Sequence, residues 1–253
     1  MSNGEGLYIY GIIAAKDRQE FGPIGIGGRG DVVYTLPYQD VAAIISSSPN
    51  VKYPVSRENV IAHARVLEKA VEKYTVLPVR FCTIATDEEI IVERVLKARH
   101  QEFLDLLREM EGKMELGIRA RWIDLNAIFA EVVEENKDIK ALKKALLNER
   151  NEQRKYASTI KIGELVQKAL EEKKKREAEE LLKALRPLSL DYKENQFYGD
   201  MNLVNAAFLV AREKERDFDR KINELEKIHS ERKQLKYTAP IVPYNFVEVV
   251  INW

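Results

Sequence analysis

The chain has 253 residues, and its 41 lysine and arginine residues are balanced by 41 acidic ones, so a zero net charge provides no general basic surface for nucleic acid. Its longest uninterrupted apolar stretch, Ala206–Ala211, is six residues long, well below the ~20 that a membrane-spanning helix needs. The single cysteine, Cys82, excludes an internal disulfide, and residues 1–6 lack the cationic and apolar parts of a secretory signal, so we expect a cytoplasmic protein.

Three β-like runs at the start of the chain predict one sheet. Residues 7–14 are rich in aromatic and β-branched side chains, and residues 31–36 and 40–46 are joined by a connection short enough for a hairpin. From Ser56 the apolar residues recur at three- and four-residue steps up to Tyr74. This pattern predicts an amphipathic helix, with Ser56 placed to cap its first turn.

A further strand and helix complete the first half. Residues 75–84 return to β character, and Pro78, which cannot donate a hydrogen bond, predicts an edge strand or a bulge. Thr86 and Glu89 have the spacing of a capping box ahead of a helix that runs to about Glu111. Gly112 ends this helix, and we therefore expect an N-terminal α+β domain over residues 1–113.

The second half predicts a sheet with a long helical insertion. Residues 114–122 alternate apolar and polar side chains, which indicates a half-buried strand. Helices are expected from Leu125 to Leu185, with breaks near 136–137 and 148–151, and Pro187 ends the last one. Nine of the ten residues 171–180 are charged, which is typical of a solvated helix with its own ion pairs.

Two more strands, a helix and a last strand follow, over residues 188–194, 201–212, 213–232 and 234–238. The resulting order β-α-β-β-α-β is that of the ferredoxin-like fold. We thus predict an α+β protein with two domains: residues 1–113, then a ferredoxin-like domain with a helical insertion over 114–238. An extended, proline-containing tail over 239–253 completes the chain.

The glycine-rich loop at residues 25–30 matches G-x-G-x-x-G, a pattern found in dinucleotide-binding proteins. That function requires a helix directly after the loop, so that the helix N-terminus faces the phosphates. The residues after Gly30 are β-like instead, so a plain glycine turn is the better interpretation, and no cofactor is predicted.

No catalytic or metal site is predicted. His63, His100 and His229 are far apart in sequence and have no second histidine or cysteine at ligand spacing. His63 lies beside the apolar stripe of the first predicted helix, so we interpret it as a packed histidine. Cys82 has no histidine placed to activate it and is interpreted as a small buried side chain.

Two surface features remain. The basic run Lys173–Arg176 is flanked by acidic residues, so a solvated helical face is favoured over binding of anionic lipid or RNA. The tail carries several large apolar side chains, which must pack on its own domain or on a partner. We predict interaction residues there: Pro240, Pro243, Tyr244 and Phe246.

Four segments together resemble the GvpF/GvpL family of gas vesicle accessory proteins: Tyr8–Ile12, Leu77–Thr83, Asp200–Val210 and Tyr237–Val247. They occur in the order and at about the spacing of the family and span nearly the whole chain. Two positions depart from it. The family often has glycine where this chain has Cys82, and its tail often reads Gly-Pro-Trp-Pro-Pro-Tyr where this chain has the run from Ala239 to Tyr244.

The resemblance implies a non-enzymatic role in building gas vesicles, the hollow protein shells that give aquatic microorganisms buoyancy. It implies binding to the major gas vesicle shell protein during nucleation or assembly, contact with other accessory proteins, and retention as a minor vesicle component. The balanced charge and the short apolar runs already predict no nucleic-acid partner and no membrane. Two alternatives stay open: a small-molecule-binding or enzymatic protein that uses a cleft between its domains, and a cytosolic scaffold whose charged helices bind other proteins.

Overall fold

The computed structural model describes residues 4–253, apart from the side chains of residues 239 and 240. The chain forms two compact units. The first contains the chain up to Leu116, the piece Leu209–Arg212 and the part from Ala239 onward, and the second contains Gly117–Phe208 and Glu213–Thr238. Each unit is built on an antiparallel sheet with helices packed against it, so the fold is mixed α and β, as predicted.

A five-stranded sheet in the order β2-β3-β4-β1-β5 forms the centre of the first unit. Its strands are β1 (Glu5–Ile13), β2 (Glu20–Gly22), β3 (Val33–Tyr38), β4 (Val41–Pro49) and β5 (Val76–Ala85). β1 pairs with both β4 and β5, so Ile12 lies between Ala43 and Leu77. The three runs predicted to share one sheet do so, as β1, β3 and β4, and β5 lies at an edge, as Pro78 predicts.

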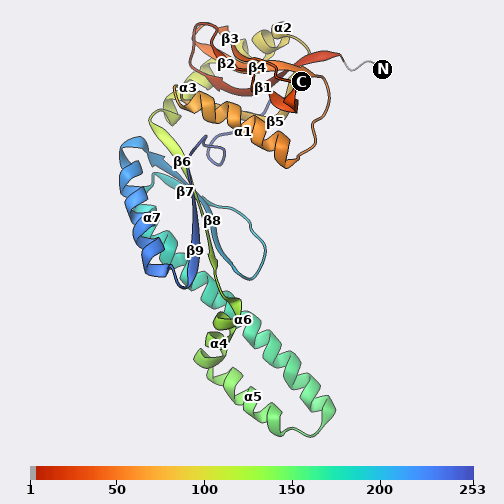
Figure 1. Ribbon diagram of the computed structural model, residues 1–253, viewed down its shortest axis with the longest axis vertical. Coiled ribbons are helices and arrows are strands. Elements are labelled where there is room, and N and C mark those ends of the chain that lie inside the picture. The colour runs from red at the N-terminus through yellow and green to blue at the C-terminus, as the bar shows by residue number, and fades with distance from the viewer. Residues whose placement is uncertain (1–3) are drawn as a thin grey trace. The chain divides into compact units, whose positions relative to one another are not determined.

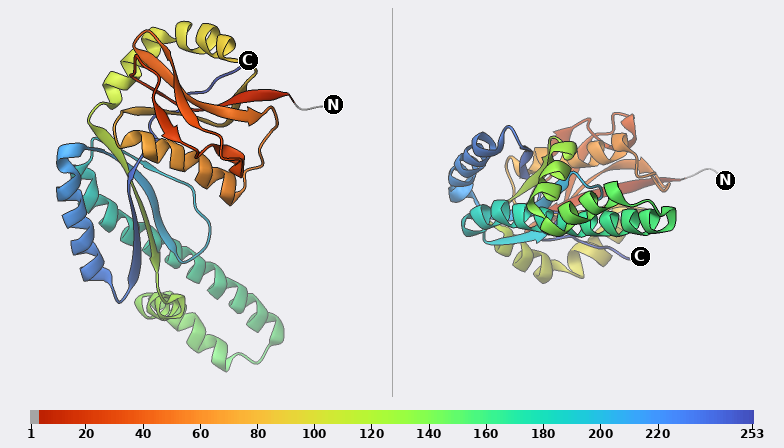
Figure 2. Two further views of the ribbon diagram at one scale, coloured as in Figure 1. Left: turned by 45° about the horizontal axis from the view of Figure 1, so that its top comes forward. Right: turned by 90° about the horizontal axis from the view of Figure 1, so that it is seen from below.

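Helices cover both faces of this sheet (Figure 2). α1 (Arg57–Val71) lies on one face. A nearly continuous helical stretch covers the other and consists of α2 (Glu88–Ile90), the π-helical part η2 (Ile91–Lys97) and α3 (His100–Met110). Ser56 caps α1 as predicted, because its Oγ accepts a hydrogen bond of 3.3 Å from the N–H of Asn59.

The predicted cap at Thr86 is wrong by one residue. Asp87 caps the second helical stretch, and its Oδ1 accepts the N–H of Ile90 at 2.8 Å. The Thr86 hydroxyl donates to the other Asp87 oxygen at 2.8 Å. A carboxylate is an acceptor whose charge the helix N-terminus also stabilises, which explains why Asp87 takes this position. The other end agrees with the prediction, because Gly112 has a φ of +68°, the left-handed conformation in which glycine ends helices.

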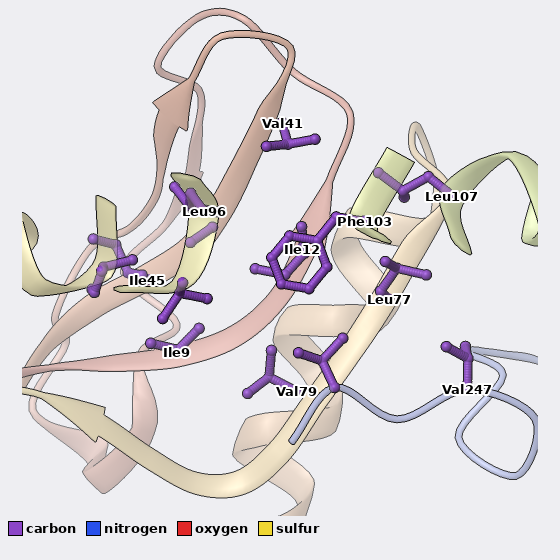
Figure 3. Packing of buried hydrophobic residues seen from close by; sticks show 14 of the residues in the cluster. Ile9, Ile12, Val41, Ile45, Leu77, Val79, Leu96, Phe103, Leu107 and Val247 are labelled. Carbon is purple, nitrogen blue, oxygen red and sulfur yellow. The ribbon is translucent and has the colours of Figure 1, made fainter. Parts of the chain in front are cut away.

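Buried apolar side chains fill the space between sheet and helices on each face. Figure 3 shows the cluster on the α3 face, in which sheet residues meet helix residues: Ile9, Ile12, Val41, Ile45, Leu77 and Val79 with Leu96, Phe103 and Leu107. Val247, far along the chain, belongs to the same cluster. Because each large apolar side chain buried this way contributes ~1.5–3 kcal/mol, these contacts fix the positions of the helices on the sheet.

A four-stranded sheet in the order β7-β8-β6-β9 forms the centre of the second unit (Figure 1). Its strands are β6 (Lys113–Trp122), β7 (Asp191–Glu194), β8 (Asn202–Ala211) and β9 (Lys233–Ile241). The helices are α4 (Leu125–Glu135), α5 (Lys137–Asn148), α6 (Glu152–Leu185) and α7 (Glu215–His229), with short 3-10 turns η3 (Arg186–Leu188) and η4 (Arg212–Lys214). The predicted order of strands and helices is thus observed, including the helical insertion.

α4, α5 and the first part of α6 form a helical arm that extends beyond the sheet (Figure 1). The two predicted breaks are confirmed. Asn136 caps α5 by accepting the N–H of Asp138 at 3.0 Å, and Asn151 caps α6 by accepting the N–H of Arg154 at 3.1 Å. Asparagine is among the preferred N-cap residues, which is why the helices restart at these positions.

The charged run in α6 is not a fully solvated face, contrary to the prediction. Lys173 is only 4% exposed and pairs with Glu135 at 2.7 Å and Glu131 at 3.0 Å. Glu177, one helical turn later and 6% exposed, accepts from Trp122 Nε1 at 2.9 Å and from Arg232 at 2.6 Å. These charges are buried because partners from α4, β6 and the start of β9 surround them, and local charge density in the sequence cannot reveal such partners.

The last strand is longer than predicted and the tail is not extended throughout. β9 continues through Ile241, so Pro240 lies inside an edge strand, where its missing N–H is tolerated. The chain then turns at residues 244–246, where the N–H groups of Phe246 and Val247 donate to the Pro243 carbonyl at 3.0 and 2.9 Å. We call residues 242–253 the C-terminal segment.

Candidate interaction site

The C-terminal segment packs into the first unit. Three of its valines are almost fully buried: Val242 at 1%, Val247 at 7% and Val249 at 0% exposure. Val242 joins the cluster on the α1 face of the sheet, and the other two join the cluster on the α3 face. The segment therefore contributes to both cores of the first unit.

Backbone hydrogen bonds attach the segment to the edge strand β5. Val249 forms a parallel bridge with Val79. Its N–H donates to the Pro78 carbonyl at 2.8 Å, and its carbonyl accepts the N–H of Arg80 at 3.1 Å. Arg99 adds a bond of 2.8 Å from its guanidinium to the Val250 carbonyl. The edge of β5, which would otherwise be open to another chain, is occupied over these residues.

A buried carboxylate holds the turn of the segment. Glu115 is 1% exposed and accepts two hydrogen bonds from Asn245, one from its backbone N–H at 2.8 Å and one from its side-chain amide at 2.6 Å. Charge-assisted bonds of this kind are roughly twice as strong as neutral ones. They fix the turn that places the neighbouring side chains, Tyr244 and Phe246.

The structure distributes the four predicted interaction residues over different environments. Pro243 is buried, and Phe246 is half-buried against the α3-face cluster. Tyr244 keeps 37% of its surface exposed, although burial raises the pKa of its hydroxyl, and its ring centroid lies 6.5 Å from that of His63 on α1. The side chain of Pro240 lies outside the described residues. Tyr244 thus presents the largest free apolar surface among the described three.

Sequence reasoning missed an exposed apolar group at the start of α1. Val60 and Ile61 are 43% and 49% exposed, and Val55, just before the helix, is 83% exposed. Val60 belongs to the periodic pattern that predicts the helix, seven residues before the buried Leu67, yet it stays exposed. Ile61 lies about 200° around the helix from His63 and so faces away from the buried side. Val55, Val60 and Ile61, together with Tyr244, which contacts α1, place four exposed apolar side chains on or beside one helix.

Aromatic rings enclose His63 beneath this surface. His63 is 4% exposed, its Nδ1 lies 3.1 Å from the Tyr8 hydroxyl, and its Nε2 has no hydrogen-bond partner within the described chain. The ring centroids of Tyr8, Tyr10 and Phe81 are 5.6–5.7 Å away. Burial lowers the pKa of His63 to about 4. The histidine is a packed side chain, as predicted, and it is neutral at physiological pH.

We expect the protein to lose stability on mild acidification because of His63. Its pKa is lower in the folded state than the ordinary 6.5, so the unfolded chain binds the proton first and the loss occurs as pH falls from about 6.5 towards 4. Between pH 7 and 5 the loss is about 2 kcal/mol. Urea unfolding at the two pH values measures it. His63→Gln removes the titration and should flatten the dependence, and an equally steep dependence in this variant would contradict the assignment.

Cys82 adopts a conformation that glycine favours. Its φ is +65°, its N–H donates to the Tyr8 hydroxyl at 2.7 Å, and its Sγ accepts the N–H of Tyr53 at 3.2 Å. A left-handed conformation costs a residue with a Cβ ~1–2 kcal/mol. This cost gives a physical reason for the glycine that the resembling family often has at this position. The thiol is half-buried, and the nearby His63 bonds to Tyr8 instead.

The glycine-rich loop forms a 3-10 turn, η1 (Ile26–Gly28), that packs on this aromatic cluster. The N–H of Ile26 donates to the Tyr10 hydroxyl at 2.8 Å. Gly27 has a φ of +83°, and a Cβ there would lie 3.0 Å from the Tyr53 hydroxyl. β3 follows the loop, so the helix N-terminus that a dinucleotide site requires is missing at this point, as the sequence indicated.

Within residues 4–253 no three histidine, cysteine or acidic side chains gather in a way that could hold a metal ion. None of the described helices combines the length and the apolar character required to cross a membrane.

Comparison with known proteins identifies the family. The family model described as gas vesicle synthesis protein GvpL/GvpF matches residues 6–248. The chain therefore belongs to the GvpL/GvpF family of gas vesicle synthesis proteins, as its four motifs indicated.

Individual relatives agree over nearly the full chain. Gas vesicle protein F of a Streptomyces species is 30% identical, covering 95% of this chain and 99% of the relative. Gas vesicle protein F of a Nostoc species is 26% identical, covering 96% and 98%. The crystal structure of GvpF from an Anabaena species superposes with a TM-score of 0.81 at 25% identity, covering 97% of this chain and 99% of that one.

Proposed function

We propose that this protein is a non-enzymatic accessory protein of gas vesicles that binds the major shell protein during nucleation or assembly. The family match over residues 6–248 supports the gas vesicle role. The exposed apolar group around α1 supports the binding role, because apolar side chains gathered on a protein surface mark sites of protein association. The proposed location is the cytoplasm, in association with the vesicle, where other accessory proteins are further candidate partners.

The proposed shell-binding surface combines Val55, Val60 and Ile61 with Tyr244 of the C-terminal segment. A shell subunit with an apolar face requires a soluble partner that covers this face before assembly, and branched and aromatic side chains suit that contact. Pro243 and the buried valines anchor the segment, and Phe246 packs against the α3-face cluster. Pairing of a shell strand with the edge of β5 is the weaker candidate, because Val249 already occupies that edge.

We further propose that the two units are two domains and that the second is ferredoxin-like. In its sheet order β7-β8-β6-β9, β8 separates the two strands joined by the first crossover, and β6 separates the two joined by the second. This is the split β-α-β arrangement of that fold. The helical arm is then an insertion in the first crossover, and the C-terminal segment is part of the first domain.

Co-purification with the major shell protein tests the proposed surface. Ile61→Asp combined with Tyr244→Asp should weaken capture at least about tenfold, because tenfold corresponds to ~1.4 kcal/mol, less than the contribution of one apolar anchor. Leu147→Asp is the matched control, since this side chain is 86% exposed on α5, outside the surface. Circular dichroism checks that each variant is folded. If the double variant unfolds, Ile61→Asp alone is used in the capture experiment. Equal capture of both variants and the parent would contradict the surface.

A further inference from the structure

The sheet of the second unit has one face that its helices leave open. Along β9, residues 234, 236 and 238 are exposed, whereas Lys233 is buried and Tyr237 stacks on Phe218 of α7. Along β6, Arg119 and Arg121 are exposed and alternate with residues buried under the helices. Successive side chains of a strand point to opposite faces, so these exposed residues lie on a single face.

Cations without acidic partners gather on this open face. A pocket of about 230 Å³ is lined by Arg119, Arg121, Lys236, Gln234, Asn202 and Ala120, and none of these residues is acidic. A second hollow of about 290 Å³ shares Arg119 and Asn202 with it and also has no acidic lining residue. The three cationic side chains form no ion pair within the described part of the chain, although most surfaces interleave charges of both signs.

We propose that this face binds an extended acidic peptide segment of a protein partner, with carboxylates two residues apart. Arg119 and Arg121 are two residues apart on β6, which spaces them by about 7 Å, and an extended peptide spaces alternate side chains in the same way. Each guanidinium can donate two parallel hydrogen bonds to a carboxylate. Lys236, on the neighbouring strand, adds a third positive charge across the groove.

The neutral lining residues favour a peptide over other anions. Gln234 carries both an amide donor and an amide acceptor, and Asn202, whose amide nitrogen also donates to the Tyr198 carbonyl, adds an acceptor oxygen, which together suit the N–H and C=O groups of a peptide backbone. Single-stranded nucleic acid favours several aromatic rings on which successive bases stack, and the two hollows have only one, Phe197, among their lining residues. A glycine loop or helix N-terminus, which commonly binds phosphate, is also missing from this lining.

Binding of a labelled peptide to the full-length protein tests the proposal. The probe alternates aspartate and threonine, and the reference peptide has asparagine in place of each aspartate. We expect the aspartate peptide to bind at least ten times more tightly, with an affinity that falls as salt rises. Arg119→Glu combined with Arg121→Glu should weaken binding at least tenfold. If this double variant unfolds, Arg119→Gln combined with Arg121→Gln replaces it in the test.

Lys143→Glu combined with Lys144→Glu is the matched control. It makes the same change in net charge at exposed lysines of α5 and should alter the affinity less than twofold. Equal losses in both double variants would overturn the proposal, because they would mean attraction by overall charge. Binding of inorganic phosphate or an RNA oligonucleotide at this face without binding of the aspartate peptide would also overturn it, as would equal affinity for the two peptides.

Discussion

Deletion of residues 242–253 should lower the free energy of unfolding by about 5 kcal/mol. The deletion removes Val242, Val247 and Val249, each almost fully buried, and each contributes at least ~1.5 kcal/mol through burial. It also removes both Asn245 hydrogen bonds from the buried Glu115 carboxylate, and loss of hydrogen bonds to a buried charged group adds to the destabilisation. The cut after Ile241 leaves β9 complete, so the loss reports on the segment alone.

Urea unfolding and binding of an apolar dye measure this effect. The truncated protein should unfold at lower urea concentration and bind more dye, because apolar side chains of the two core clusters become exposed to solvent. Removal of Trp253 alone is the matched control, since this residue is 51% exposed and belongs to neither cluster, and it should leave stability nearly unchanged. A protein lacking residues 242–253 that unfolds like the full chain would show that the segment does not hold the first unit together.

The second large effect is expected from Glu177→Ala, with a loss of about 3–5 kcal/mol. Burial alone would raise the pKa of Glu177, but the bonds from Arg232 and Trp122 lower it to about 2, so the carboxylate is ionised at neutral pH. Its removal leaves Lys233, only 2% exposed and 3.2 Å from the Glu177 carboxylate, without its near counter-charge. Breaking one side of a buried ion pair costs several kcal/mol, more than the pair itself contributes.

Glu179→Ala, two residues further along α6, is the control for this prediction. Glu179 pairs with Arg186 at 2.7 Å, but its side chain is 55% exposed, and exposed pairs contribute less than about 1 kcal/mol. Chemical unfolding of both variants measures the difference. If Glu177→Ala and Glu179→Ala lost similar amounts of unfolding free energy, the stabilising effect of Glu177 would not depend on its burial.

The sequence predicts the elements of this fold well where the information is local. Periodicity of apolar residues, the cap at Ser56, the breaks near residues 136–137 and 148–151, and the glycine at position 112 place most of the helices and strands. The cap predicted at Thr86 is wrong because local sequence leaves two choices there. Thr86 and Asp87 can each accept a hydrogen bond from the first N–H groups of the helix, and only the geometry of the turn selects Asp87.

The candidate sites depend on contacts that local patterns do not contain. Val249 meets Val79 across 170 positions of the chain, and the tail composition alone predicts only that it must pack somewhere. Charge density in α6 likewise predicts solvation, and only the approach of Trp122 and Arg232 buries Glu177. The alternation in β6 places Arg119 and Arg121 on the open face, but the addition of Lys236 follows from the pairing of distant strands.

Binding of the purified full-length protein to the major gas vesicle shell protein tests the central claim most directly. The two proteins are expressed together, and capture of one by a tag on the other is measured after washing at high salt, which removes loose electrostatic attachment. We expect the shell protein to remain bound to the parent chain and to the Leu147→Asp control. Absence of capture with a correctly folded parent chain, while an accessory protein of the same vesicle captures the shell protein under the same conditions, would contradict the proposed function.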